Sequence, residues 1–274
     1  DLHSFPTRRS SDLEMNTRNL IAFTDLGEDS HISNTQLWTG NGMGIPSNQT
    51  NNEYSTMVDE HSAARDIDQA STELDGISGF SGGVDYEKLA SARLLNSSEY
   101  TVNTSLGYIS LRTVLQTDQV LAVAYEYTYG GVTYQVGEFA ADHTNAREAL
   151  FVKSLKNTSN NPRQGNWKLM MKNVYYLAST VEKTKFRLDI KYQSDTTGVY
   201  LTYIPEPQVK DMPIIRLMGA DRLDNNNQPH PNGYFDFVEG YTIQNGRVFL
   251  PAAEPFGDYL RRCLQAAGVS ISRS

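Results

Sequence analysis

The feature that most constrains the fold is a pair of β-rich runs, Gln119–Tyr129 and Val132–Phe139, joined by Gly130-Gly131. A type I′ turn needs positive φ angles at both central residues, and glycine adopts them without steric cost. The pattern therefore predicts a β-hairpin with a two-residue turn. A chain with this hairpin at its centre is expected to build its fold around antiparallel sheets.

Further strands are expected on both sides of this hairpin. In Lys185–Gln193 apolar and polar residues alternate, which predicts one buried face and one solvated face. Asp195–Gly198 and Asn245-Gly246 are turn signals for two more hairpins. The other expected strands are Leu20–Phe23, Leu106–Leu111, Val199–Ile204, Ile214–Met218 and Arg247–Leu250.

A few short helices are expected beside the strands. Apolar residues three and four apart predict helices over Ala63–Leu74 and Tyr86–Leu95. Ala146–Leu155 has a mixed period, for which we expect a helix, whereas Trp167–Leu177 is compatible with helix or strand. The segment Asn16–Asn52 is rich in Asn, Thr and Gly and is expected to be mainly loop. The fold class is thus mainly β, with antiparallel sheets and hairpins, sandwich-like or barrel-associated, and a few short helices.

Composition excludes several classes of protein. The 274 residues are 39% hydrophobic and 20% charged, enough apolar surface for one large domain or two ordinary ones. The net charge of −8 disfavours a nucleic-acid binder, which needs a basic face. The single cysteine, Cys263, excludes an internal disulfide and a multi-thiolate zinc site. No apolar run reaches the length of a transmembrane helix, while transmembrane β-strands, whose sequence signal is weak, stay open.

The two ends of the chain differ in character from the rest. Residues 1–13 lack the apolar segment of a secretory signal. They resemble a translated sequencing adapter, so we expect the native sequence to begin near Glu14. We expect an N-terminal β-rich module with short helices over 14–140 and a second β-rich module over 141–262. Residues 263–274 are expected to be a tail or an artefact.

One polar loop gathers oxygen-bearing side chains of the kind that hard cations such as calcium prefer. The loop departs from the EF-hand pattern in its glycine and in its terminal glutamate. An Asx-rich turn is therefore the favoured interpretation, with a calcium site as the alternative. The residues are Asp221, Asp224, Asn225, Asn226, Asn227, Asn232 and Asp236.

No catalytic, cofactor-binding or metal-binding residue is predicted. Gly40–Gly44 lacks the spacing of a phosphate-binding loop. The carboxylate pairs Asp59-Glu60 and Asp66/Asp68 suggest a glycosidase pair only if the fold brings them to catalytic distance. The scattered histidines, none paired at ligand spacing, are His3, His31, His61, His143 and His230.

Tyrosine is unusually abundant, with 16 tyrosines against two tryptophans. Tyrosine-rich sheets occur as carbohydrate-binding platforms, as interfaces and as the aromatic girdles of outer-membrane proteins. Ordinary half-buried sheet tyrosines are the alternative to all three.

Several local phrases, taken in order over about residues 16–262, resemble the SprA/Sov family. In the first half they are Asn19–Glu28, Leu106–Leu111, Val120–Tyr129 and Tyr134–Phe139, the last reading Tyr-Gln-Val-Gly-Glu-Phe. In the second half they are Trp167–Tyr175, Phe235–Gly240 and Leu250–Gly257. The chain departs from the family at Pro231-Asn232-Gly233, where relatives tend to have Pro-Asp-Gly, and the lost carboxylate weakens the calcium alternative.

Members of this family are very large cell-surface proteins of Bacteroidetes that form the outer-membrane β-barrel translocon of type IX secretion and are needed for gliding motility. The resemblance implies an internal fragment of such a translocon, at the outer membrane or cell surface. The implied partners are the rest of the translocon chain, other secretion-system subunits, secreted cargo proteins and the outer membrane, without nucleic acid. The family has no catalytic motif to carry over, so the resemblance implies no enzyme and no cofactor.

The main alternative is a secreted carbohydrate- or surface-binding β-sandwich whose tyrosine-rich sheet is the contact face. Such a module should fold alone as a soluble monomer, whereas strands taken from a translocon should have unpaired edges and aggregate without their neighbours. A third alternative, a hydrolase, requires paired carboxylates within catalytic distance in a cleft.

Overall fold

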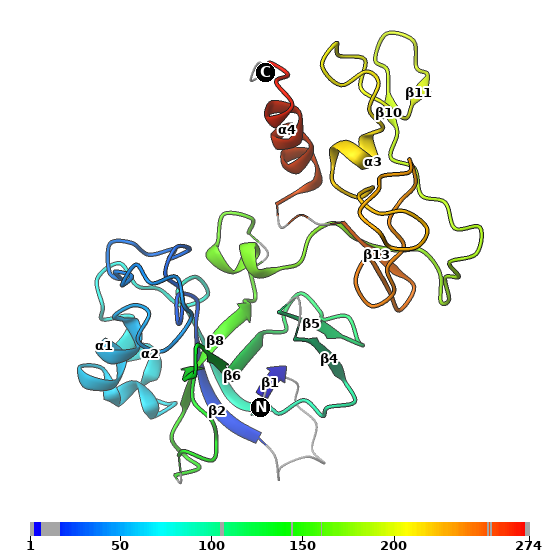
Figure 1. Ribbon diagram of the computed structural model, residues 1–274. Coiled ribbons are helices and arrows are strands. Elements are labelled where there is room, and N and C mark those ends of the chain that lie inside the picture. Colours follow the sequence, from blue (N-terminus) through cyan, green and yellow to red (C-terminus); the bar gives the residue numbers. More distant parts are fainter. Residues whose placement is uncertain are drawn as a thin grey trace. The chain divides into compact units, whose positions relative to one another are not determined.

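A computed structural model describes residues 3–6, 17–104, 107–143, 145–159, 161–250, 252 and 254–271 (Figure 1). The fold is mainly β, with antiparallel sheets and a few short helices, which confirms the expected fold class. The chain forms two compact units, Asp1–Met170 and Met171–Ser274.

The first unit is built on one mixed sheet. Its strands follow the order β1-β6-β8-β2-β3, and β7 pairs with the far part of β6. All of these pairs are antiparallel except that of β2 with β8. The strands are β1 (His3–Pro6), β2 (Thr17–Phe23), β3 (Tyr86–Arg93), β6 (Leu121–Tyr129), β7 (Val132–Val136) and β8 (Leu150–Lys156). A separate hairpin consists of β4 (Tyr100–Asn103) and β5 (Tyr108–Leu111). Strand β5 corresponds to the strand expected over Leu106–Leu111, of which Leu106 lies outside the described residues.

The central hairpin prediction is confirmed. Tyr129 of β6 faces Val132 of β7, which leaves only Gly130 and Gly131 in the turn. Their φ angles are 60° and 80°, the two positive values that a type I′ turn requires.

The helix predicted over Tyr86–Leu95 is wrong, because most of this segment is strand β3. Tyr86 is buried in one face of the sheet, and Leu89 and Ala92 are buried in the other. A bulge at this point, where Ser91 has a φ of 55°, keeps Leu89 and Ala92 on one face. Two buried faces and a bulge together produce the three-residue spacing that imitates a helix.

The helix predicted over Ala146–Leu155 is also wrong, because this segment contains β8. The strand lies between β2 and β6 in the middle of the sheet. Leu150 and Val152 pack on one face, and Phe151 packs on the other. A strand covered on both faces is apolar throughout and loses the alternation that identifies a half-buried strand.

Three short helices cover one face of this sheet: α1 (Glu53–Asp59), η2 (Ser62–Arg65) and α2 (Ala70–Leu74). A further short helix, η3 (Gly165–Leu169), follows β8 in the chain. The helix predicted over Ala63–Leu74 is present as two pieces, η2 and α2. The chain turns between them at Asp66–Gln69, where the Asp66 carboxylate accepts a hydrogen bond from the Asp68 amide. Helix α1 was not expected from the sequence. Met57 of α1 and Leu74 of α2 pack with Phe23 and Phe151 of the sheet, so this face is the larger part of the core.

The second unit has shorter strands. One sheet has the order β12-β13-β9, and β10 pairs with β11. The elements are β9 (Val174–Tyr176), β10 (Tyr192–Gln193), β11 (Tyr200–Leu201), α3 (Ile214–Leu217), β12 (Ile243–Gln244), β13 (Arg247–Phe249) and α4 (Phe256–Ala266). Both predicted hairpins are confirmed: Asn245 and Gly246 have positive φ angles between β12 and β13, and the turn at Asp195–Gly198 connects β10 to β11. Trp167–Leu177, which the sequence left open, contains part of η3 and then β9.

Two strand predictions fail in this unit. Of Lys185–Gln193 only the last two residues form a strand, although Phe186, Leu188 and Ile190 still pack on one side of the extended chain. The alternation is real, but within the described residues no strand pairs with 185–191. Ile214–Met218 is mostly helix α3, since the Pro213 carbonyl accepts the amides of Arg216 and Leu217 and starts a helical turn.

The two compact units do not divide near residue 140, because β8 belongs to the sheet of the first unit. At the other end, α4 continues past Arg262 to Ala266, so 263–266 belong to a helix. Among the residues the structure describes, no helix is long and apolar enough to cross a membrane.

Candidate functional site

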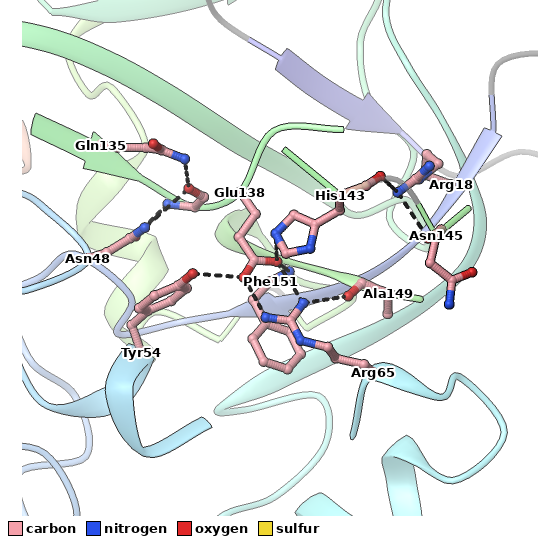
Figure 2. Close-up of polar contacts among 11 residues, drawn as sticks. Arg18, Asn48, Tyr54, Arg65, Gln135, Glu138, His143, Asn145, Ala149 and Phe151 are labelled. Atoms are coloured by element: carbon pink, nitrogen blue, oxygen red, sulfur yellow. Dashed lines mark hydrogen bonds and ion pairs between the residues drawn. The ribbon is translucent and has the colours of Figure 1, made fainter. Parts of the chain in front are cut away.

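A dense group of polar contacts surrounds Glu138, whose side chain is 2% exposed (Figure 2). Arg65 donates a hydrogen bond to each oxygen of this carboxylate, from Nη1 to Oε2 at 2.9 Å and from Nη2 to Oε1 at 2.6 Å. Two parallel hydrogen bonds of this kind fix the planes of the two groups relative to each other. We call Glu138 and its partners Tyr54, Arg65, His143 and Phe151 the Glu138 centre.

The remaining partners complete the shell around the carboxylate. The Tyr54 hydroxyl donates to Oε1 at 2.8 Å, and the Phe151 amide donates to Oε2 at 2.9 Å. The Nε2 atom of His143 lies 3.4 Å from Oε2. Burial raises the pKa of Glu138, but the hydrogen bonds from Arg65 and Phe151 outweigh burial and hold this pKa below its usual range. Glu138 is therefore a buried carboxylate that stays ionised.

Local backbone geometry turns Glu138 toward the core. Gly137, which precedes it, has a φ of 75°, and the Asn48 side chain brackets this peptide (Figure 2). The Gly137 amide donates to Asn48 Oδ1 at 2.8 Å, and Asn48 Nδ2 donates to the Gly137 carbonyl at 3.3 Å. A side chain at Gly137 would also lie 3.1 Å from the Cβ of Ala124. Position 137, directly after the end of β7, therefore requires glycine.

Arg65 connects the Glu138 centre to its neighbours. Its guanidinium lies over the ring of Phe151, 4.1 Å from the ring centroid, and donates to the Ala149 carbonyl at 3.2 Å. The Ala149 amide donates back to the Arg65 carbonyl at 2.7 Å. These contacts fasten η2 to the start of β8.

The chemistry available to Glu138 follows from its partners. Both oxygens already accept strong donors, so neither is free to act as a nucleophile or a general base. Burial raises the pKa of the Tyr54 hydroxyl, and the carboxylate of Glu138 raises it further, so Tyr54 stays protonated. The Glu138 centre is thus an anchor between the helices and the sheet, and no sequence motif predicted it.

A groove with a volume of about 830 Å³ opens at the surface beside Arg65. It is lined by residues 17–19, 62–63, 65–69, 91 and 145–148, and we call it the polar groove. Arg18 ties two of its walls together by donating to the carbonyls of His143 and Asn145, at 3.2 and 3.4 Å. Asp66 and Asp68 both line this groove, but the Asp66 carboxylate accepts the amide of Asp68 in a turn.

A second buried polar group surrounds Lys153, which is 4% exposed. Its ammonium donates to the Thr24 carbonyl at 2.5 Å and to Oε1 of Glu28 at 2.8 Å.

Glu53 is fully buried, and neither of its carboxyl oxygens has a hydrogen-bond partner within the described part of the chain. Burial, followed by the nearby Asp25, raises the pKa of Glu53 well above its usual range. Burial therefore favours the neutral form of the Glu53 carboxyl group in the folded protein.

The glycine-rich loop Gly40–Gly44 holds a carboxylate of the chain itself. The amides of Gly42 and Gly44 donate to the two oxygens of Asp29, at 3.0 and 2.5 Å. A Cβ at Gly40 would lie 2.1 Å from Asp29 Oδ1. The amides of this loop thus bind the carboxylate of Asp29, an anionic group of the same chain.

The polar loop at Asp221 has the hydrogen bonds of an Asx-rich turn. The Asp221 oxygens accept the amides of Asn232 and Gly233, and Arg216 donates to the same carboxylate at 2.9 Å. Asp236 accepts the amides of Arg222 and Leu223, and Asp224 accepts those of Asn226 and Gln228. Across the described ranges, no group of three or more His, Cys, Asp or Glu side chains is arranged to hold a metal ion.

Among the described side chains, His31, His61 and His143 each have a different partner. His61 contacts Glu73 at 2.8 Å and His31 contacts Ser30 at 2.7 Å, while His143 belongs to the Glu138 centre. The side chain of His3 lies outside the described residues.

Tyrosines form a stacked row on the β6–β7 hairpin. The ring centroids of Tyr125 and Tyr127 are 6.1 Å apart, and those of Tyr127 and Tyr134 are 5.5 Å apart. All three side chains are half-buried, and the Tyr127 hydroxyl donates to the Pro46 carbonyl at 2.7 Å. The rings therefore contact one another and a covering loop as much as they face solvent.

Comparison with known proteins identifies no family. No protein-family model and no curated protein matches the chain. The likeness to the SprA/Sov family stays a prediction from the local phrases of the sequence.

Proposed function

We propose that this chain is a structural portion of a large outer-membrane translocon for protein secretion of the type IX kind. The observation that carries the proposal is the ordered series of phrases that resemble the SprA/Sov family. Several of these phrases coincide with the centre of the first unit. Asn19–Glu28 includes most of β2, Val120–Tyr129 includes β6, and Tyr134–Phe139 ends with Glu138 and its neighbour. The resemblance therefore rests on residues that build the sheet and its anchor.

The chemistry of the Glu138 centre supports the same proposal. A translocon encloses and gates a path for its cargo, so its parts need rigid sheets more than reactive side chains. Arg65 and Glu138 bind each other rather than presenting a reactive group to solvent.

Exposed aromatic residues support a role inside a larger assembly. The end of the β6–β7 hairpin exposes Tyr129 and Val132, 65% and 52%. In the second unit Tyr176 is 66% exposed and Tyr200 is 62% exposed. Aromatic side chains of this kind are enriched where protein surfaces meet. The proposed partners are the rest of the translocon chain, other secretion subunits, cargo proteins and the outer membrane.

A genetic experiment tests the proposal in the bacterium that encodes this chain. The coding segment for residues 16–262 is deleted in frame, and the culture supernatant is compared with the parent strain by quantitative mass spectrometry. We expect a broad loss of secreted proteins and of colony spreading. Unchanged secretion would contradict the proposal.

Point variants sharpen this experiment. Arg65→Ala removes the partner of a buried carboxylate, whereas Arg93→Ala removes one side of the more exposed Arg93–Glu99 pair. We expect the first variant to lower secretion and the second to leave it unchanged. Equal secretion by both variants and the parent would count against a role for this sheet in the translocon.

A biochemical experiment separates the proposal from the carbohydrate-binding alternative. The whole chain is purified without detergent and analysed by size-exclusion chromatography and far-ultraviolet circular dichroism. Aggregation that detergent relieves supports a translocon segment, because unpaired strand edges and exposed aromatic residues associate. A sharp monomer that melts cooperatively favours the autonomous binding module.

A further inference from the structure

We propose that the polar groove of the first unit is a binding site for a neutral oligosaccharide. The groove has a volume of about 830 Å³, within the range of roughly 300–1,000 Å³ that is usual for small-molecule sites. The inference is independent of the proposed translocon role, because it rests on the lining of the groove alone.

The walls of the groove are held in place by hydrogen bonds between segments far apart in the sequence. Asn19 Nδ2 donates to the Arg147 carbonyl at 3.3 Å, and Arg18 donates to two carbonyls of the same segment. On the other wall Arg65 is fixed by Glu138 and by the carbonyl of Ala149. A site with fixed walls loses little conformational entropy when a ligand binds.

The side chains that build the walls are distinct from those that are free for a ligand. Within the described residues, the guanidinium of Arg147 and the carboxylate of Asp68 form no ion pair or hydrogen bond. Both residues line the groove and are exposed, as are Ser62 and Ser91. A ligand that meets all four must both donate and accept hydrogen bonds.

The charges of the lining select among ligands of this kind. The lining contains three arginines and three carboxylates, so it carries no net charge. The six residues are Arg18, Arg65, Arg147, Asp66, Asp68 and Glu148. A lining without net charge gives no long-range attraction to an anion or a cation, which favours a neutral ligand.

A sugar meets these requirements. Each hydroxyl group donates and accepts a hydrogen bond, so adjacent hydroxyls can reach Asp68 and Arg147 together. Ala63, Ile67 and Ala146 add apolar surface to the lining, which suits the C–H faces of a sugar ring. The proposed contact thus differs from the tyrosine row, whose rings are half-buried and whose central hydroxyl is already bonded.

The test uses the full chain, in detergent where the chain aggregates without it, and isothermal titration calorimetry with three neutral probes: maltohexaose, cellohexaose and hexa-N-acetylchitohexaose. A zwitterionic dipeptide, glycylglycine, serves as the competing ligand class. Asp68→Asn removes the charge and keeps the size of the side chain, and Arg147→Gln removes the charge and leaves a shorter polar side chain. Arg112→Gln and Asp142→Asn are matched controls, because both residues are exposed in the same unit and lie outside the groove.

We expect at least one hexasaccharide to bind, and we expect Arg147→Gln and Asp68→Asn each to weaken binding by about tenfold or more, as for a hydrogen bond to a charged group. The control variants should bind like the parent chain. No binding of any hexasaccharide at about 10 mM, a concentration that detects even weak millimolar affinity, would overturn the proposal. Binding of glycylglycine alone, or sugar binding that neither groove variant changes, would overturn it as well.

Discussion

Arg65 and Glu138 lie 73 residues apart in the sequence and form a two-pronged ion pair whose side chains are only 15% and 2% exposed. Arg65 ends η2, and Glu138 lies two residues after the end of β7. The pair therefore joins the helical cover of the first unit to its sheet. Removing one partner leaves the other charged and buried, which is more costly than the loss of a surface pair.

Arg65→Ala is expected to destabilise the protein by about 3–5 kcal/mol, because Glu138 then stays buried without its counter-charge. Urea unfolding followed by circular dichroism measures this change. Arg93→Ala is the matched control, since the Arg93–Glu99 pair also has two short contacts but is 25% and 35% exposed. For this exposed pair we expect a change of about 1 kcal/mol or less. Equal losses in the two variants would show that burial of Glu138 does not matter.

Glu53→Gln is expected to stabilise the protein at neutral pH. The pKa of Glu53 is raised in the folded state by burial, then by Asp25 and also by Asp85, against the opposing effect of Lys153. The folded protein therefore keeps a proton that the unfolded chain releases above its ordinary pKa, near 4.5. Stability consequently falls as the pH rises from this value toward the raised pKa of the folded state.

Glutamine has the shape of the neutral acid but cannot ionise in the unfolded chain. The stabilisation by Glu53→Gln should therefore be small at pH 4 and larger at pH 7. Urea unfolding at both pH values measures the difference between the variant and the parent. A constant difference at the two values would contradict a raised pKa for Glu53.

Much of this fold follows from local rules, and the errors have a common cause. Gly130-Gly131 and Asn245-Gly246 specify their turns through the φ angles that glycine and asparagine tolerate, so both hairpins could be predicted. Phe151 could not be placed in a strand, because a strand buried on both faces lacks alternation. The partners of Glu138 could not be predicted at all. They come from segments that only the folded sheet brings together, and a single carboxylate has no spacing from which to infer them.

Gly137→Ala is expected to destabilise the protein more than Gly131→Ala. Both glycines have positive φ angles, 75° and 80°, so each substitution costs about 1–2 kcal/mol in backbone strain. A Cβ at Gly131 meets nothing within 4 Å, whereas a Cβ at Gly137 lies 3.1 Å from the Cβ of Ala124. Gly137→Ala must also disturb the Asn48 contacts that direct Glu138 inward. Urea unfolding of the two variants decides the order, and a larger loss for Gly131→Ala would contradict the close approach at Gly137.

Hydrogen exchange of the full chain should separate the two units. Strands β2 and β8 lie in the interior of a sheet with an apolar cluster on each face, so their amides open only when the first unit unfolds. In the second unit β10, β11 and β12 contain only two residues each, and Tyr176 and Tyr200 are exposed beside their strand partners. Local opening of such short strands exposes little apolar surface and should be frequent. Mass spectrometry of peptic peptides should therefore find slow exchange over 17–23 and 150–156 and fast exchange over 192–201. If the exchange rates of these peptides were the same, the second unit would owe its stability to contacts other than its short strand pairs.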